Sequence, residues 1–429
     1  MTFRCLFILI ASLTACDASA KQTLTVLTAY HEEVVAQFET AFERDHPDID
    51  VKIIWRMPHD ALPYLRQRNQ GGVDVYWSAS LHNYLQLKQE GAWQKLKLDR
   101  DGLPEKLGVM PLIDPDGFYC ATEMAGYGFV VNPGYMKKHR LPEPKTWQDL
   151  IDARYSGHIA LAVPSRFGFA PLMIGSVLQQ YGWERGWALF SEVAGNAQLL
   201  EHNRGFITDV VGSGKLGIAP SLDFFATSAR ANGAPLQLLY PEPVAYSPAH
   251  IAITASTRQA QAARQFVGFI LSAQGQRLLF HPDIRKLPVR PAVYADKPEG
   301  QFDPFAAAVL HSPVYDPSTT LPRLALQNAL FDLFLTERHD QLKPLWQRLH
   351  ELETQNSRSD ETLAEVRHLL TAAPISLDLA SDISVQQSFE KRIKDADADM
   401  QAKSLENTWR SDISRKYQRA EQLLAAWRH

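Results

Sequence analysis

Residues 24–47 read LTVLTAYHEEVVAQFETAFERDHP, and this stretch holds the signals for a strand, a turn and a helix. Its first four residues are apolar or β-branched, which favours a β-strand. The apolar residues that follow recur at helical spacing and form one stripe: Val34, Val35, Phe38, Ala41 and Phe42. Pro47 ends the pattern, because proline cannot continue a helix. The stretch therefore predicts a strand at 24–27 and an amphipathic helix at 31–46, the repeating unit of an α/β protein.

The same alternation of short apolar runs and helical patterns continues to residue 300. The runs expected to form strands are 24–27, 51–55, 73–77, 128–131, 158–162, 216–219, 236–239 and 250–254. Helices are expected between them, for example at 172–180 and 260–271. Residues before the break at 300 are thus predicted to fold as α/β.

The chain changes character at Gly300, because all 23 glycines lie at or before this residue. The remaining residues, 301–429, are predicted to form a helical C-terminal extension, with helices at 321–335 and 342–352. Two further helix starts are indicated by the capping patterns Thr362-x-x-Glu365 and Ser384-x-x-Gln387, the second opening a long helix.

The last predicted helix carries apolar side chains at steps of three and four: Leu405, Trp409, Ile413, Tyr417, Ala420, Leu424 and Trp427. Two interpretations stay open. Such a stripe ordinarily packs on the core of its own protein, and here it would join the extension to the α/β body. Alternatively, it is a docking surface for a membrane partner.

Composition excludes several classes of protein. The 429 residues carry 44 Lys and Arg against 48 Asp and Glu, so the net charge is −4, and no basic block is present. Nucleic-acid binding, which needs a basic surface, is therefore not expected. Three cysteines are too few for a disulfide scaffold or a cysteine-rich zinc module, and Cys120 is expected to be a lone buried thiol.

The first twenty residues resemble an export signal. Arg4 precedes the apolar run 5–13, and small residues end at Ala20. Residues 13–16, LTAC, also resemble a bacterial lipobox, in which Cys16 would be lipidated and the following Asp17 would resemble an inner-membrane retention signal. The alternatives are a lipid anchor and simple cleavage after Ala20. The apolar run is shorter than the roughly 20 residues that span a bilayer, so an exported, periplasmic protein is expected.

Two candidate binding segments lie in the first part of the chain, each between a predicted strand and a predicted helix. In the first, Thr28, Tyr30 and His31 offer hydroxyls and an imidazole beside a helix N-terminus, whose free amides attract anions. In the second, Ser78 and Ser80 likewise place hydroxyl groups between the end of a strand and the start of a helix. The alternative roles are structural, with Thr28 and one serine capping helices and His31 facing solvent.

Two more candidate segments follow. Ser165 and Arg166 precede a predicted helix, so an anion would meet amides, a hydroxyl and a guanidinium together. Asp223 follows another strand, and a carboxylate in an anion site would face a hydroxyl or amine of a bifunctional ligand. The structural alternatives are a solvent-exposed Arg166 beside a capping Ser165, and Asp223 as the cap of the next helix.

With these segments placed, the chain to about residue 300 resembles a type II periplasmic solute-binding protein of the ferric-ion, thiamine, phosphonate and hexose-phosphate group. The resemblance is carried, in order, by residues 24–30, 74–78, 127–133, 144–150, 155–160, 182–187 and 262–276. It implies two α/β lobes joined by crossing strands, with the ligand between them. The lobes are expected at 21–120 plus 250–300 and at 121–249, with the helical extension at 301–429 packing on this body.

The extension, together with residues 323–332, is similar to that of the periplasmic protein of phosphoglycerate-transport regulatory systems, which works beside a membrane sensor kinase. The resemblance therefore implies two kinds of partner. One is an inner-membrane ABC permease that takes up the solute, and the other is a sensor kinase that reads the loaded protein.

The function expected from these features is capture of a small phosphorylated or phosphonate metabolite by closure of two lobes. Ferric-ion uptake is the first alternative. The resemblance implies that iron-binding members hold the metal with an adjacent pair of tyrosines. This chain has Phe224 and Phe225 at that place, and phenylalanine offers no oxygen to a hard cation. An exported phosphatase or esterase is the second alternative, although no nucleophile-elbow, zinc-protease or phosphate-loop motif occurs. No catalytic residue, metal or cofactor is therefore expected.

Overall fold

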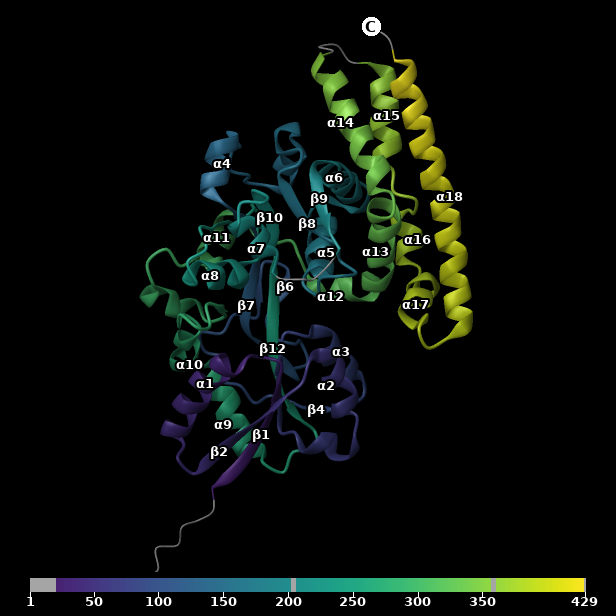
Figure 1. Cartoon of the computed structure of the whole chain (residues 1–429). Coiled ribbons are helices and arrows are strands. Elements are labelled where there is room, and N and C mark those ends of the chain that lie inside the picture. The colour runs from purple at the N-terminus through teal and green to yellow at the C-terminus, as the bar shows by residue number, and fades with distance from the viewer. Residues whose placement is uncertain (1–20, 202–205, 356–359, 428–429) are drawn as a thin grey trace, which may run out of the picture.

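The computed structural model describes residues 21–201, 206–355 and 360–427; the predicted signal sequence and Cys16 lie outside these residues. Figure 1 shows two α/β lobes, one above the other, and a set of helices along one side of the upper lobe. We call the lower part, built on strands β1, β2 and β3, lobe 1. The upper part, built on β8, β9 and β10, is lobe 2.

Lobe 1 has a parallel sheet in the order β2, β1, β3, followed by the antiparallel strand β12. Its strands are β1 (Gln22–Thr28), β2 (Ile49–Trp55) and β3 (Val75–Ser78). Its helices are α1 (Glu32–Asp45), α2 (Pro58–Leu65), α3 (Leu81–Gln89), α9 (Ala260–Leu271) and α10 (Ala273–Leu278). The stripe of α1 faces inward as expected, with Val35, Phe38, Ala41 and Phe42 buried. The strand and the helix predicted at 24–46 are confirmed.

Lobe 2 contains three parallel-running strands, β8 (Ile159–Ala162), β9 (Ala197–Leu200) and β10 (Ile218–Leu222). Its helices are α4 (Pro133–His139), α5 (Ala170–Tyr181), α6 (Trp183–Asn196), α7 (Ile207–Gly212) and α8 (Asp223–Ala231). Strand β9 lies at the sheet edge beside β8 and was not predicted. Its four residues follow directly on α6, so the sequence shows no separating turn there.

Two long strands join the lobes. Strand β7 (Tyr119–Val131) pairs with β12 (Tyr246–Thr254) along its first part and with β10 along its last part, so one strand runs through both lobes. The sequence predicted only 128–131 of this strand. All thirteen residues are buried, including polar ones, and the apolar pattern therefore underestimates its length. Short strands β4 (Trp93–Gln94), β11 (Gln237–Leu239) and β13 (Leu287–Pro288) complete the sheet, and β5 (Lys106–Leu107) pairs separately with β6 (Met110–Pro111).

The carboxyl ends of the strands in lobe 1 point toward the carboxyl ends of the strands in lobe 2. In lobe 2, β10 ends opposite Tyr127, near the middle of β7, and β8 runs parallel to it. In lobe 1, β3 ends with Ser78 opposite His250 of β12, and β1 runs parallel to β3. Ligands of open α/β sheets bind at the carboxyl ends of strands. We call this region, where the two sets of strand ends meet at β7 and β12, the inter-lobe edge.

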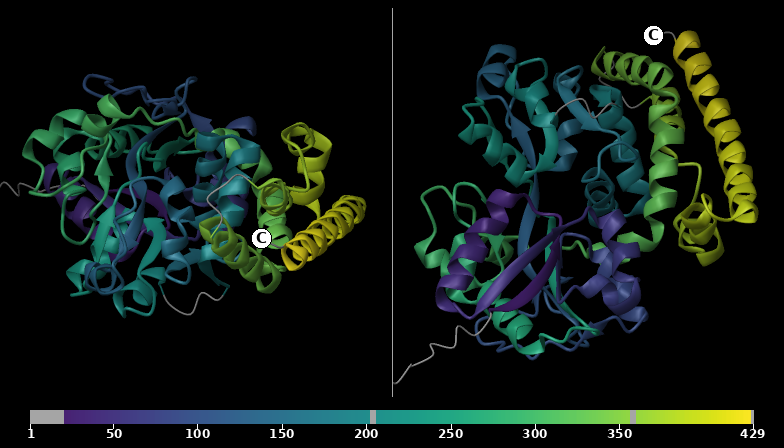
Figure 2. Two further views of the ribbon diagram at one scale, coloured as in Figure 1. Left: turned by 90° about the horizontal axis from the view of Figure 1, so that it is seen from above. Right: turned by 60° about the horizontal axis from the view of Figure 1, so that its bottom comes forward.

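The C-terminal extension is helical, as predicted; its first helix, α11, packs against the core of lobe 1, and α12–α18 lie along lobe 2 (Figures 1 and 2). Its helices are α11 (Pro304–Leu310), α12 (Pro317–Thr320), α13 (Leu324–Phe331), α14 (His339–Gln355), α15 (Glu361–Thr371), α16 (Leu377–Ser381), α17 (Ile383–Lys391) and α18 (Ala396–Ala426), with a π-helical turn at Asp332–Thr336. Among the described residues, no helix is long and apolar enough to cross a membrane.

Three predicted features of the extension need correction. The N-caps of α15 and α17 are Asp360 and Asp382, two residues before the predicted Thr362 and Ser384, because the aspartates accept the free amide hydrogens directly. The helix that opens near Ser384 is short. The long helix is α18, which begins after its own cap, Asp395.

The extension from Tyr315 onward and lobe 2 share one hydrophobic core, whereas Phe302, Phe305 and Ala308 at its start pack against one of the two clusters of lobe 1. Trp409, Ile413, Tyr417, Ala420 and Leu424 of α18 are buried in the shared core. The core-packing interpretation of the apolar stripe is therefore confirmed. From α12 onward, the extension is an integral part of lobe 2 rather than an appended tail.

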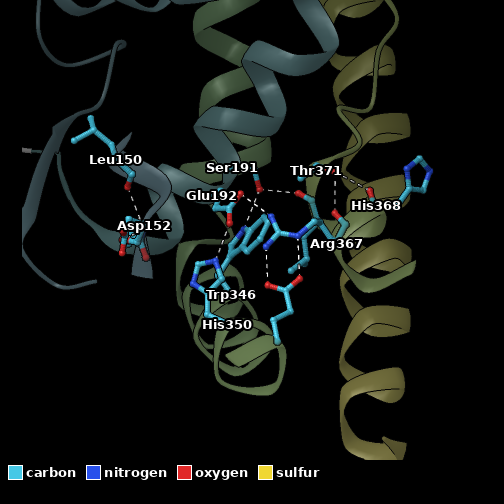
Figure 3. Close-up of polar contacts among 12 residues, drawn as sticks. Leu150, Asp152, Ser191, Glu192, Trp346, His350, Arg367, His368 and Thr371 are labelled. Atoms are coloured by element: carbon cyan, nitrogen blue, oxygen red, sulfur yellow. Dashed lines mark hydrogen bonds and ion pairs between the residues drawn. The ribbon is translucent and has the colours of Figure 1, made fainter. Parts of the chain in front are cut away.

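A buried polar network also ties the extension to helix α6 of lobe 2 (Figure 3). The Glu192 carboxylate accepts hydrogen bonds from His350 Nε2 at 2.8 Å and from an Arg367 guanidinium nitrogen at 2.7 Å. Arg367 also forms a two-pronged ion pair with Glu353, at 3.0 and 2.8 Å. Because Glu192 is buried, these two partners provide the hydrogen bonds that an isolated buried carboxylate would lack.

Candidate functional site

The first predicted segment lies on the lobe 1 side of the inter-lobe edge. Thr28 is buried, and its hydroxyl accepts the Tyr30 amide hydrogen at 3.1 Å, so it stabilises the turn rather than a helix end. The Tyr30 hydroxyl donates to Glu123 of β7. His31 is exposed and stands at the N-cap position of α1 without a capping hydrogen bond. Of these three residues, Tyr30 contacts the crossing strand.

The second predicted segment reaches the same edge at the end of β3. Ser78 is buried and donates its amide hydrogen to the Tyr84 hydroxyl at 3.0 Å, but its own side-chain oxygen has no hydrogen-bond partner within the described residues. Ser80 is the N-cap residue of α3 and makes no side-chain capping bond. Opposite Ser78 lies His250, which is also buried and whose Nδ1 is unpartnered in the part of the chain that the structure describes.

Burial holds His250 in its neutral form and lowers its pKa to about 3, whereas a histidine in an unfolded chain titrates near about 6.5. Below that pH the unfolded chain takes up a proton that the folded protein does not, so stability is lost as the pH falls.

In a His250→Gln variant this contribution is expected to vanish. The difference in free energy of unfolding between the two proteins should then change by up to about 1.4 kcal/mol per pH unit below about pH 6.5. Urea unfolding over this range measures it. Parallel stability curves for the two proteins would contradict the assignment.

Asp223 lies on the lobe 2 side, and its carboxylate is taken up by protein donors. It accepts the Gly126 amide hydrogen at 2.8 Å, the Tyr240 hydroxyl at 3.0 Å and the Phe224 amide hydrogen at 2.7 Å. Burial raises the pKa of Asp223 to about 6, although these hydrogen bonds act to lower it. Asp223 is the first residue of α8 rather than its cap, and it fastens this helix to β7.

Ser165 and Arg166 follow β8, and both side chains are exposed. The Ser165 hydroxyl donates to Asp332 Oδ1 of the extension at 3.0 Å. The third segment therefore contacts the extension. The structure thus brings Tyr30 and Asp223 toward the centre of the edge, while Ser165 and Arg166 lie beside Asp332.

Sequence reasoning missed Lys286, the cation at the centre of the edge. Its ammonium lies 4.9 Å from the ring centre of Tyr30 in lobe 1 and 4.5 Å from that of Phe224 in lobe 2. It forms no ion pair with any described residue, and its charge favours the ionised form of Asp223. Lys286 is placed by the adjoining short strand β13, which pairs with β7. No local motif marks it, because its position depends on this long-range pairing.

Sequence reasoning also missed Glu123, although a single charged residue within an apolar strand is a signal that could have found it. It stands alone among apolar and small residues of β7 and is buried. One carboxylate oxygen accepts the Tyr30 hydroxyl, and the other, Oε2, has no hydrogen-bond partner in the described ranges. A buried carboxylate oxygen without a partner is costly, so it marks a place where a ligand or water would bind.

Four buried polar atoms without partners among the described residues come from strands that meet at the inter-lobe edge: Ser78 Oγ, Glu123 Oε2, Ser221 Oγ and His250 Nδ1. Such atoms are uncommon in folded proteins, and each needs an explanation.

Within the same described ranges, no three His, Cys, Asp or Glu side chains gather in a way that could hold a metal ion. Cys120 is buried and its burial raises its pKa to about 12, as expected for an inert thiol.

Two lobes on a shared pair of crossing strands, with polar groups where their strand ends meet, define a two-lobed solute-binding protein. The chain belongs to the bacterial extracellular solute-binding protein family, whose model matches residues 75–304. A curated relative, the phosphoglycerate transport regulatory protein PgtC of Salmonella typhimurium, is 32% identical over 379 residues, which cover 88% of this chain and 92% of the relative. The proteins of this family bind solutes.

Solved structures show the same fold. AfuA from Actinobacillus pleuropneumoniae with fructose 6-phosphate bound has a TM-score of 0.55 at 19% identity, and covers 76% of this chain and 98% of its own. Iron-bound HitA from Pseudomonas aeruginosa has a TM-score of 0.58 at 18% identity, and covers 72% of this chain and 98% of its own. The type II periplasmic-binding-protein fold expected from the resemblance is confirmed.

Proposed function

We propose that this protein captures a small phosphorylated or phosphonate metabolite between its two lobes. The observation that carries the proposal is the position of Lys286, a cation without an ion-pair partner among the described residues that contacts aromatic rings from both lobes. An anion bound to it would touch both sides of the edge. A ligand that contacts both lobes stabilises the closed arrangement by its higher affinity for that state.

The buried carboxylate of Glu123 adds a second requirement on the ligand. Its unpartnered Oε2 accepts hydrogen bonds and would repel a bare inorganic anion. A ligand that carries a hydroxyl or an amine in addition to its phosphate satisfies both Glu123 and Lys286. The bifunctional ligand that Asp223 suggested is thus better supported by Glu123, since Asp223 is occupied by protein donors.

The names of the relatives are consistent with this chemistry, since PgtC is a phosphoglycerate transport regulatory protein and the AfuA structure holds fructose 6-phosphate. Ferric ion is less well supported, because Phe224 and Phe225, whose ring centres are 4.3 Å apart, supply no oxygen ligand. We further propose that the protein works in the periplasm, where an inner-membrane ABC permease or a sensor kinase recognises its closed form. Export by the 1–20 signal, with or without lipidation of Cys16, belongs to the same proposal.

A thermal-shift comparison tests the function. Residues 21–429 would be heated with 3-phosphoglycerate, fructose 6-phosphate, inorganic phosphate or ferric citrate. A ligand that binds only the folded state stabilises it by about 2.7 kcal/mol at a hundred times its dissociation constant, which raises the melting temperature. The proposal expects the largest rise with a phosphate ester. A rise with ferric citrate alone would favour iron uptake, and release of inorganic phosphate from the esters would indicate an enzyme.

Arg166→Ala is expected to weaken binding of the same ester by about tenfold, because Arg166 offers a charge-assisted hydrogen bond to an anion at the end of β8. The residue is exposed, so its removal should leave the melting temperature of the ligand-free protein nearly unchanged. Titration calorimetry measures the affinity. An unchanged dissociation constant would remove Arg166 from the site.

A further inference from the structure

The C-terminal extension places a carboxylate directly on a predicted anion-binding segment. Asp332 begins the π-helical turn between α13 and α14, and it accepts the Ser165 hydroxyl hydrogen at 3.0 Å. The charge of Arg166 also favours the ionised form of Asp332, although burial raises the pKa of that carboxyl overall. The two side chains that would attract a ligand anion at the end of β8 therefore already interact with an anion of the protein itself.

The turn that carries Asp332 is firmly connected to the rest of the extension. Leu333, Phe334 and Leu335 are buried in the core shared with lobe 2. The Phe334 carbonyl accepts the Tyr417 hydroxyl of α18 at 2.9 Å. One short turn thus contacts Ser165 at one end and the outermost helix of the extension at the other. Single π-helical turns are rare and frequently occur at functional sites.

We propose that Asp332 is an affinity-determining residue of the ligand site: it occupies the position of the ligand anion at Ser165 and Arg166 and is displaced when the anion binds. The inference rests on the proposed function. It assigns the extension a role in binding, since displacement of Asp332 shifts the 332–336 turn and, through Tyr417, changes the contacts of α18.

The test compares Asp332→Asn with Asp340→Asn in the mature chain. Asparagine at 332 still accepts the Ser165 hydrogen bond but no longer competes as an anion. Asp340 is an exposed residue of the neighbouring α14, so its variant has the same net charge without the contact to Ser165. Titration with a phosphate ester is expected to show about tenfold tighter binding by Asp332→Asn and unchanged binding by Asp340→Asn.

Hydrogen exchange provides a second measurement. Adding the ester to the wild-type protein should increase exchange at 332–336 and in the facing part of α18, and this response should be absent in Asp332→Asn. Equal or weaker affinity in Asp332→Asn, with normal binding by wild type, would overturn the inference but leave the proposed function intact. Binding by neither protein would overturn both.

Discussion

Replacing Lys286 with methionine is expected to weaken binding of a phosphate ester by about 10- to 100-fold, the largest effect predicted for any single site residue. Hydrogen bonds to charged groups are worth about 1.5–3 kcal/mol, and Lys286 would supply one at the centre of the inter-lobe edge. Methionine retains the length and apolar stem of lysine, so contacts with the rings of Tyr30 and Phe224 are largely retained. The variant therefore isolates the charge.

Titration calorimetry with the ester identified by thermal shift measures this effect. Lys138→Met is the matched control, because Lys138 is an exposed lysine of α4 and its loss changes the net charge equally. The control should bind with wild-type affinity. Wild-type affinity in Lys286→Met as well would show that the anion does not bind at Lys286, and would remove the observation on which the proposed function depends.

Trp346→Ala is expected to have the largest effect on stability, lowering the free energy of unfolding by about 3–5 kcal/mol. Trp346 is fully buried between α14 and α6, where its indole nitrogen donates to the Ser191 hydroxyl at 3.1 Å. Its ring packs so closely on Gly195 that an added Cβ there would lie 2.6 Å from ring atoms. The substitution leaves a cavity at the junction of the extension and lobe 2.

Urea unfolding followed by far-ultraviolet circular dichroism measures the loss, with Trp55→Ala as the control because Trp55 is 50% exposed. Since lobe 2 and the extension share a core, both should unfold in one transition in the wild-type protein. A Trp346→Ala protein of unchanged stability would contradict the shared core. So would a wild-type extension that unfolds in a step of its own.

Comparison of particular elements shows how far the sequence predicts this protein. The strand and helix at 24–46, the buried thiol of Cys120 and the inward-facing stripe of α18 were all predicted correctly, because each depends on local periodicity or on the burial preference of one residue. The length of β7 was underestimated, since it is buried from end to end and its polar residues do not alternate with apolar ones.

The candidate site was only partly predictable. Ser78 ends a strand, and Tyr30, Ser165 and Asp223 follow strands. The topology places those strand ends at one edge. Whether each binds a ligand stays a prediction. Their hydrogen-bond partners lie far away in the chain: Glu123 for Tyr30, Asp332 for Ser165 and Gly126 for Asp223. No local pattern specifies such contacts.

The sequence by itself determined the α/β character of residues before Gly300, the helical extension after it, and the family to which the chain belongs. These properties follow from periodicity, composition and motif order, which are local and read along the chain. Only the tertiary structure decided that Lys286 reaches both lobes and that Asp332 meets Ser165. Those contacts arise from strand pairing and core packing between residues more than sixty positions apart.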